Sequence, residues 1–246
     1  MRRLPACGVP RTPAMMIEVL ADPAAVVERA CEVIESAASR TVALAGGTTG
    51  EMLCRALGSR GSLSSVDVWM VDERCVPPDS RDSNARMIRQ TLGESFHRIL
   101  GEEAPEEAAR IYEEELLARL GAEPVFDLVV LGMGADGHVA SLFPDSPELA
   151  ERRRAVVATR ETHGGFRRVT LTLPVLNRAR QKLFVESGPG KSVAFARIQS
   201  GDLLPAGRIL GATWIVDRAA ATSPSPATHR GASHDPIEGQ EVLFEL

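Results

Sequence analysis

The chain has 246 residues, enough to bury a sizeable core, and its 28 basic and 33 acidic side chains give a formal net charge of −5. That balance produces no long-range field that would attract nucleic acid or anionic lipid, and an aromatic content of 4% is too low for a base-stacking surface. We therefore expect no nucleic acid and no membrane among its partners. The cysteines lack Cys-x-x-Cys spacing and are predicted to be reduced thiols.

The two ends of the chain differ in composition from its middle. Residues 1–14 lack the apolar segment of an export signal, and the chain has no run of about 18 apolar residues that would cross a membrane, so we expect a cytoplasmic protein. This segment is predicted to be either a disordered extension or a misplaced start, since the ordered pattern begins at Met15. Residues 15–221 contain no linker and are predicted to form a single α/β domain. Residues 222–246, rich in Ser, Pro, Ala, Thr and Gly, are predicted to be a flexible tail.

Strand-like and helical segments alternate along the predicted domain. Short apolar runs indicate strands, and apolar residues at helical spacing behind capping residues such as Asp22 and Ser83 indicate helices. The run at 126–131 indicates a strand buried on both faces, as expected at the centre of a parallel sheet. In chain order, strands are predicted at 41–45, 66–71, 126–131, 155–159, 169–173, 182–187 and 213–217, and helices after residues 22, 49 and 83 and over 106–120. The alternation predicts a doubly wound, mostly parallel α/β sheet flanked by helices.

In such folds ligands bind beyond the carboxyl ends of the strands, so the loops that follow strands hold the candidate site residues. Gly46, Gly47, Thr48 and Thr49 lie between the first predicted strand and a helix. Backbone amides, a helix N-terminus and two hydroxyls at this place suit a phosphate monoester. The same four residues would also form an ordinary tight turn with a threonine N-cap.

Charged residues follow two other predicted strands. Asp72 and Arg74 come after the second strand, and the guanidinium of Arg74 offers a planar fork of donors to a phosphate or carboxylate. Lys191 lies in Ser-Gly-Pro-Gly-Lys-Ser, which resembles the end of a phosphate-binding loop. Val185 replaces the first glycine of that motif and disfavours a nucleoside triphosphatase. Solvated surface charges are the alternative at both places.

The segment from Gly132 to His138 reads Gly-Met-Gly-Ala-Asp-Gly-His and carries the most chemistry. Histidine has an ordinary pKa of about 6.5, which suits a general base, and Asp136 is placed to orient His138. The glycine spacing also matches a dinucleotide fingerprint, but Pro144 and Pro147 cut short the helix that such a site needs. We predict catalytic roles for His138 and Asp136; a purely structural histidine is the alternative.

Several catalytic motifs do not occur in the sequence. No Gly-x-Ser-x-Gly elbow supplies a serine nucleophile, and no His-Glu-x-x-His or compact Cys/His cluster indicates zinc. The groups that remain are a histidine, acids, backbone amides and cations. They suit water activation or proton transfer, so we expect no cofactor and no metal.

Several segments occur together in one order: Leu44-Ala-Gly-Gly-Thr-Thr49, Val71-Asp-Glu-Arg-Cys-Val-Pro-Pro-Asp79, Asp82-Ser-Asn84, Phe126-Asp-Leu-Val-Val-Leu-Gly-Met-Gly-Ala-Asp-Gly-His-Val-Ala-Ser-Leu-Phe-Pro144, Arg168-Val-Thr-Leu-Thr-Leu-Pro-Val-Leu-Asn177, Gly190-Lys191 and Trp214-Ile-Val-Asp217. Over roughly residues 17–221 this set resembles the glucosamine-6-phosphate isomerase/6-phosphogluconolactonase family. The resemblance implies the fold of that family and the lactonase reaction, which hydrolyses 6-phospho-D-glucono-1,5-lactone to 6-phosphogluconate in the oxidative pentose phosphate pathway. It also implies roles for individual residues: His138 as the base, Arg74 and Lys191 as substrate-orienting cations, and Gly46 to Thr49 as the phosphate loop.

On this hypothesis His138 removes a proton from water as the water attacks the lactone carbonyl. Backbone amides near Gly134 or in the Gly46 loop would stabilise the oxyanion. Asp136 would order the His138 loop, and Asp72 would hold Arg74 or a sugar hydroxyl. The expected partner is a small phosphorylated sugar lactone, and the chain is expected to be a monomer or a weak homo-oligomer.

Two other functions stay open. A deaminase/isomerase of the same family has an aromatic residue where Arg74 stands and a ring-opening glutamate where Phe143 aligns, so both positions favour the lactonase. A non-catalytic sugar-phosphate-binding regulator would use the same fold without turnover. Thr162-His-Gly-Gly165 does not match the family, and no substrate contact is assigned to it.

Overall fold

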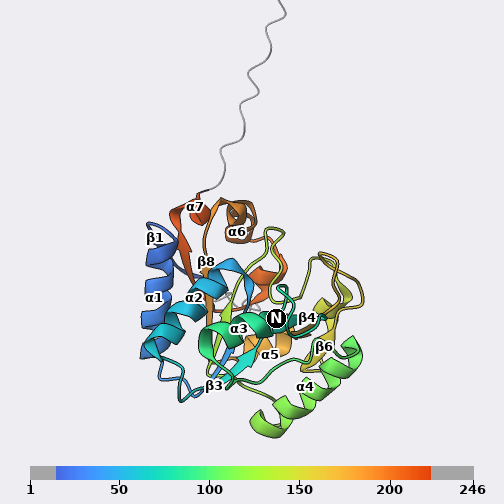
Figure 1. The fold of residues 1–246 in the computed structure, drawn as a ribbon. Helices are drawn as coiled ribbons and strands as arrows, with labels where there is room; N and C mark the ends of the chain where they lie inside the picture. Colours follow the sequence, from blue (N-terminus) through green and yellow to red (C-terminus); the bar gives the residue numbers. More distant parts are fainter. Residues whose placement is uncertain (1–14, 223–246) are drawn as a thin grey trace, which may run out of the picture.

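Six parallel strands form the central sheet of residues 15–222, the part of the chain that the computed structural model describes. The predicted N-terminal extension and nearly all of the predicted tail lie outside these residues. Across the sheet the strands are β1 (Met16–Leu20), β9 (Thr213–Asp217), β8 (Gln181–Glu186), β5 (Leu128–Leu131), β2 (Thr41–Leu44) and β3 (Asp67–Met70). Helices surround the sheet (Figure 1). The predicted doubly wound, mostly parallel fold is confirmed.

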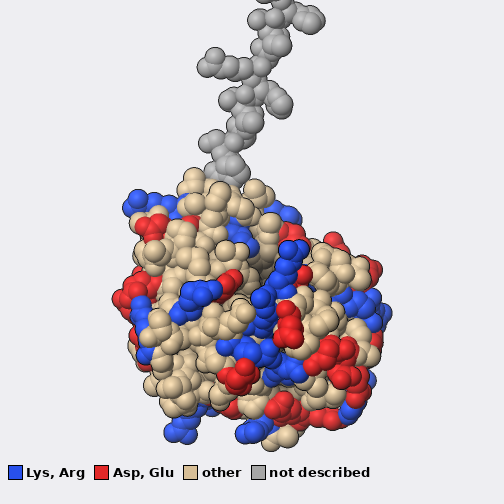
Figure 2. Space-filling view, viewed as in Figure 1, with Lys and Arg blue, Asp and Glu red and all other residues tan. Residues whose placement is uncertain are grey.

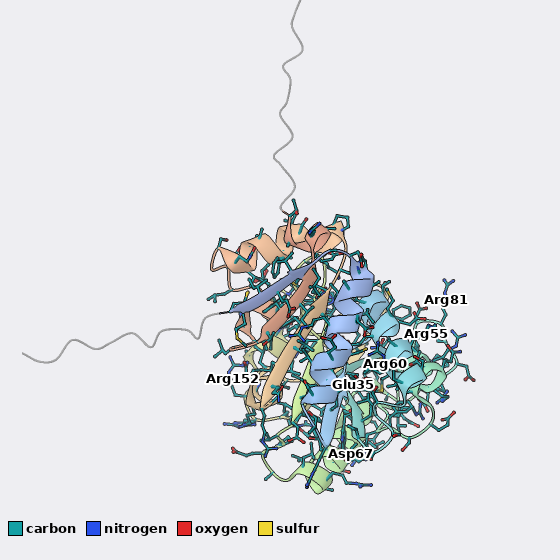
Figure 3. The ribbon with its side chains drawn as sticks, turned by 90° about the vertical axis from the view of Figure 1, so that its left-hand side faces the viewer. Glu35, Arg55, Arg60, Asp67, Arg81 and Arg152 are labelled. Atoms are coloured by element: carbon teal, nitrogen blue, oxygen red, sulfur yellow. The ribbon has the colours of Figure 1, made fainter. Side chains whose placement is uncertain are left out.

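Alternate residues of the strands face two helical layers. In β2, Val42 and Leu44 pack with one layer, whereas Ala43 packs with the other. The first layer contains α1 (Pro23–Ser36) and α2 (Gly47–Arg60), which lie side by side, with Arg60 3.7 Å from Glu35 (Figure 3). The remaining α-helices of residues 15–222 are α3 (Asn84–Leu92), α4 (Pro105–Leu120), α5 (Leu173–Arg178), α6 (Ser192–Gln199) and α7 (Arg218–Ala221). None of the helices within residues 15–222 is both long and apolar enough to cross a membrane.

The strand order reverses at β2. From β2 the chain passes through α2 to β3 on one side, and it later returns to β5 on the other side. The loops after β2 and β5 therefore leave the sheet in different directions and open the crevice in which doubly wound folds bind ligands. All four residues of β5 are buried, as predicted for the centre of the sheet.

A second, antiparallel sheet extends from the edge of the first. Its strands, in order, are β4 (Asp72–Arg74), β7 (Arg168–Leu171) and β6 (Val156–Ala158). Val71 joins the two sheets: its N–H donates to the carbonyl of Leu44 at 3.1 Å, and its carbonyl accepts from the N–H of Leu171 at 2.8 Å. The strands predicted near 155–159 and 169–173 therefore exist. They belong to this second sheet, because β7 pairs with β4, which follows β3 along the chain after Val71, and β6 pairs with β7.

Tyr112 supports the outer edge of the parallel sheet. β3 is the last strand there, so the backbone of Met70 needs partners other than a neighbouring parallel strand. The buried hydroxyl of Tyr112 supplies a partner for both backbone groups of Met70: it accepts from the N–H and donates to the carbonyl, each at 2.8 Å.

We predict that Tyr112→Phe lowers the free energy of unfolding by about 2 kcal/mol, because it leaves a buried donor and a buried acceptor without their partner. Denaturant titration with an unchanged m-value would measure this loss. A change below about 0.5 kcal/mol would show that Met70 is satisfied in another way.

Candidate active site

A cavity of about 500 Å³ opens at the carboxyl ends of β2 and β5. The loops after these two strands, the end of β4 and the segment after β8 form its wall. On the face that carries α3 and β4, Lys and Arg side chains gather near the middle (Figure 2). Of the predicted site residues, Gly46, Gly47, Thr48, Thr49, Asp72, Arg74, His138 and Lys191 line the cavity. Asp136 does not line it and instead bonds to His138.

The loop after β2 places a helix N-terminus at the cavity. α2 begins at Gly47, with Gly46 as its N-cap. A Cβ at position 46 would lie 2.0 Å from Oδ1 of Asn84, so the close approach of Asn84 requires glycine. The hydroxyl of Thr49 lies 2.9 Å from the hydroxyl of Ser187, whereas Thr48 is exposed. The partial positive charge of the helix N-terminus therefore lies at the cavity.

Asp72 and Arg74, on β4, are both held by Asn84. The side-chain nitrogen of Asn84 donates to the carbonyl of Asp72 at 3.0 Å, and its oxygen accepts from Nη1 of Arg74 at 2.8 Å. Nη1 also donates to the carbonyl of Asp82 at 2.9 Å. The carboxylate of Asp72 accepts from the hydroxyl of Ser141 at 2.6 Å. Arg74 is therefore fixed by neutral oxygens and keeps its positive charge available to a ligand.

Glu73 lies between these two residues and points away from the cavity. Its buried carboxylate accepts from the backbone N–H groups of Asn84 at 2.8 Å and Ala85 at 2.7 Å, and from the hydroxyl of Ser83 at 2.9 Å. Burial raises the pKa of Glu73, although these hydrogen bonds oppose the shift. Glu73 thus anchors the N-terminus of α3, which carries Asn84 into the site.

The loop after β5 closes on itself around His138. The N–H of Gly134 donates to the carbonyl of His138 at 2.9 Å. Oδ1 of Asp136 lies 2.6 Å from Nδ1 of His138 and also accepts from its backbone N–H at 3.1 Å. With the Nδ1 proton directed to Asp136, Nε2 is the nitrogen that can take a proton. The amide of Gly134 is engaged in the loop, so in this geometry it does not serve the oxyanion role considered for it.

The surroundings of His138 favour its neutral form. Burial lowers the pKa of His138, and the guanidinium of Arg168 acts in the same direction, whereas the carboxylates of Asp136 and Asp72 oppose the shift. For Asp136, burial acts to raise the pKa, but His138 and the hydrogen bonds lower it overall. A neutral imidazole beside an ionised carboxylate is therefore expected near neutral pH, which is the form that a general base requires.

Lys191 is tied to the same loop as His138. It ends the short helix η2 (Pro189–Lys191), and its Nζ donates to the carbonyl of Met133. Oε2 of Glu186 lies 4.0 Å from this nitrogen. Glu186 is 2% exposed, and burial raises its pKa to about 8, although Lys191 opposes the shift. Asp217 fixes the residue just before η2, because its carboxylate accepts from the N–H of Gly188 at 3.0 Å.

Several residues of the cavity were not predicted from the sequence. Arg168 supplies a third cation, and the pairing of β4 with β7 sets it opposite Arg74. Asn84, Glu186 and Ser187 also line the cavity. Two of them left a sequence signal: Asn84 follows the helix cap Ser83 close to Arg74 in the chain, and Ser187 begins the Ser-Gly-Pro-Gly-Lys-Ser segment.

The cavity thus combines a histidine, a helix N-terminus and the cations Arg74, Arg168 and Lys191. In chemical terms, such a set is able to bind a phosphorylated anion and to move a proton at a nearby atom. Within residues 15–222, no three or more His, Cys, Asp or Glu side chains are grouped closely enough to hold a metal ion.

Residues 11–216 match the family described as glucosamine-6-phosphate isomerases/6-phosphogluconolactonase. A human protein named 6-phosphogluconolactonase is 38% identical over 220 residues, which cover 80% of this chain and 85% of that protein. The solved 6-phosphogluconolactonase of Trypanosoma cruzi superimposes with a TM-score of 0.76 at 28% identity, covering 85% of this chain and 97% of that one. The enzyme of that name from Thermotoga maritima gives a TM-score of 0.74 at 30% identity and covers 83% of this chain and 100% of that one.

The contact between Asp136 and His138 predicts how the pKa of His138 responds to a substitution at position 136. Asp136→Asn removes the carboxylate that stabilises the charged imidazole but keeps the shape of the side chain, so the pKa of His138 should fall further below its ordinary value. NMR titration of the histidine ring signals would measure the shift. Asp145→Asn, which neutralises an exposed carboxylate further along the chain, just after Pro144, should leave the pKa of His138 unchanged. An unchanged or higher value in Asp136→Asn would disprove the assigned pairing.

Proposed function

The chain belongs to the glucosamine-6-phosphate isomerase/6-phosphogluconolactonase family, and from this premise we propose that it hydrolyses 6-phospho-D-glucono-1,5-lactone to 6-phosphogluconate. The observation that carries the proposal is the position of His138 in a cavity lined by three cations: Nδ1 is bonded to Asp136, and no residue of 15–222 bonds to Nε2. A phosphorylated lactone needs both features, because the cations hold its phosphate while the histidine activates water.

The proposed reaction begins when Nε2 of His138 takes a proton from a water molecule. The water oxygen bonds to the lactone carbonyl carbon, and the carbonyl oxygen becomes an oxyanion. When the intermediate collapses, the bond between this carbon and the ring oxygen breaks, and the proton held by His138 passes to the ring oxygen. Asp136 stabilises the imidazolium between these two transfers.

Charge on the oxyanion is stabilised by backbone donors at the cavity. The amide of Gly134 is engaged by His138, whereas the neighbouring amide of Ala135, also at the cavity, donates to no residue of 15–222. We assign the oxyanion to the amide of Ala135. The N-terminus of α2, together with Arg74 and Lys191, is then available for the phosphate.

Two features disfavour the deaminase reaction of the same family. Arg74 stands where a deaminase has an aromatic residue, and Phe143 stands where it has a ring-opening glutamate. Phe143 is 6% exposed and carries no group that transfers protons, so ring opening of an amino sugar has no acid at this position.

The first test is acid release from freshly prepared lactone, with spontaneous hydrolysis subtracted, in parallel with ammonia release from glucosamine-6-phosphate. We expect acceleration of the first reaction alone. His138→Ala should lower the rate by roughly 10²- to 10⁴-fold with an unchanged unfolding transition, because the general base is lost. Wild-type turnover in this variant would remove His138 from the mechanism. Ammonia release would identify a deaminase, and the absence of both reactions would point to a binding protein.

A second prediction concerns phosphate recognition. Lys191→Met keeps the apolar stem and removes the charge, so KM for the lactone should rise roughly 10- to 100-fold while kcat changes less, as expected for the loss of a charge-assisted hydrogen bond. Arg197→Met, which removes an exposed cation from the neighbouring helix α6, should leave both constants unchanged. If kcat rather than KM changes in Lys191→Met, the lysine acts through the His138 loop and not on the phosphate.

A further inference from the structure

Three aromatic rings lie in contact with one another beside the cavity. The ring centroids of His138 and Phe143 lie 4.4 Å apart at an angle of 42°. Phe143 also stacks on His163, with centroids 3.6 Å apart and planes within 7°. The guanidinium carbon of Arg168 lies 5.4 Å from the centroid of Phe143. Phe143 thus contacts two histidine rings and a cation, a geometry favourable to aromatic contacts.

His163 belongs to the segment that the family resemblance left unexplained, and its position is well defined. Gly164 and Gly165 have φ values of +64° and +86°, as in the tight turn of a β-hairpin. The N–H of His163 donates to the carbonyl of Phe166 at 2.8 Å across this turn. The carbonyl of His163 accepts from Nη2 of Arg168 at 3.1 Å. The backbone on both sides of the imidazole is therefore fixed, and the ring presents a rigid plane to Phe143.

We propose that His163 is a positioning residue, which clamps Phe143 against the imidazole of His138 and so fixes the tilt of that ring. The inference rests on the proposed function. Asp136 holds His138 at Nδ1, and a single hydrogen bond leaves the ring free to rotate about that contact. The ring of Phe143 restricts this rotation, and Phe143 in turn is held by the coplanar ring of His163, its closest aromatic contact.

The clamp also controls how much water reaches His138. The charged groups that act on the pKa of His138 are Asp136 in its own loop, Asp72 on β4 and Arg168 on β7; burial and Arg168 lower the pKa and outweigh the two carboxylates, which raise it. Loss of the ring at position 163 would let Phe143 move and admit water to the imidazole. The pKa of His138 should then rise toward its ordinary value. His163 does not line the cavity, so binding of the substrate should change little.

The test compares His163→Ala with His163→Phe, which keeps a planar ring for the stack. In His163→Ala we expect kcat to fall roughly 3- to 10-fold, KM to stay within about twofold and the pKa of His138, followed by NMR, to rise by roughly 0.5. His163→Phe should restore all three values. Thr162→Ala, at an exposed neighbour on the same hairpin, is the matched control and should behave as wild type.

Three results would overturn the inference: unchanged kcat and pKa in His163→Ala, an equal loss in His163→Phe, or an effect on KM alone. If His163→Ala does not fold, His163→Leu fills the volume without a planar ring and is expected to give the same loss. The NMR titration needs no substrate, so it tests the clamp even if the lactone is not hydrolysed. Absence of turnover in the wild type would refute the proposed function, whereas an unmoved pKa of His138 would refute only the clamp.

Discussion

The backbone of Val71 bonds to two sheets at once, and the site depends on this junction. The N–H of Val71 belongs to the parallel sheet and its carbonyl to the antiparallel one, so the chain leaves the first sheet and enters the second without a loop. The alternation of a strand then sets Asp72 and Arg74 on the cavity side and Glu73 on the opposite side. Because β7 pairs with β4, Arg168 comes to lie opposite Arg74. Like charges directly opposite one another destabilise a sheet, so an anion bound between Arg74 and Arg168 would relieve the repulsion between them.

The parallel half of the fold could be predicted because its strands are short apolar runs with helices between them. β5 is buried on both faces, and its sequence carries that signature. β1 was not predicted, because this edge strand leaves Met16 and Val19 exposed and its apolar residues are interrupted by Glu18. β4 could not be predicted as a separate strand, since all three of its residues are charged and only pairing with a segment far along the chain makes it a strand.

The same distinction applies to the site. The loops after β2 and β5 were found because a topological rule places ligands there whatever the details of packing. The sequence did not predict that Arg168 lies at the cavity, because its position depends on the register between β4 and β7, which no local pattern reveals. The burial of Glu73 could not be predicted either. An acidic residue between two site residues is ordinarily solvated, and it is the otherwise unpaired amides at the start of α3 that make its burial favourable.

The contact between Gly46 and Asn84 has a consequence for attempts to redesign the substrate range of this protein. A side chain introduced at position 46 would displace Asn84, and Asn84 is one of the two residues that hold Arg74, with Asp82. Substitutions at position 46 would therefore alter the position of Arg74 as well, and their effects would not add to those of changes at Asn84. A mutant library aimed at new sugar phosphates should randomise positions 46 and 84 together, because beneficial combinations would be lost when each position is screened alone.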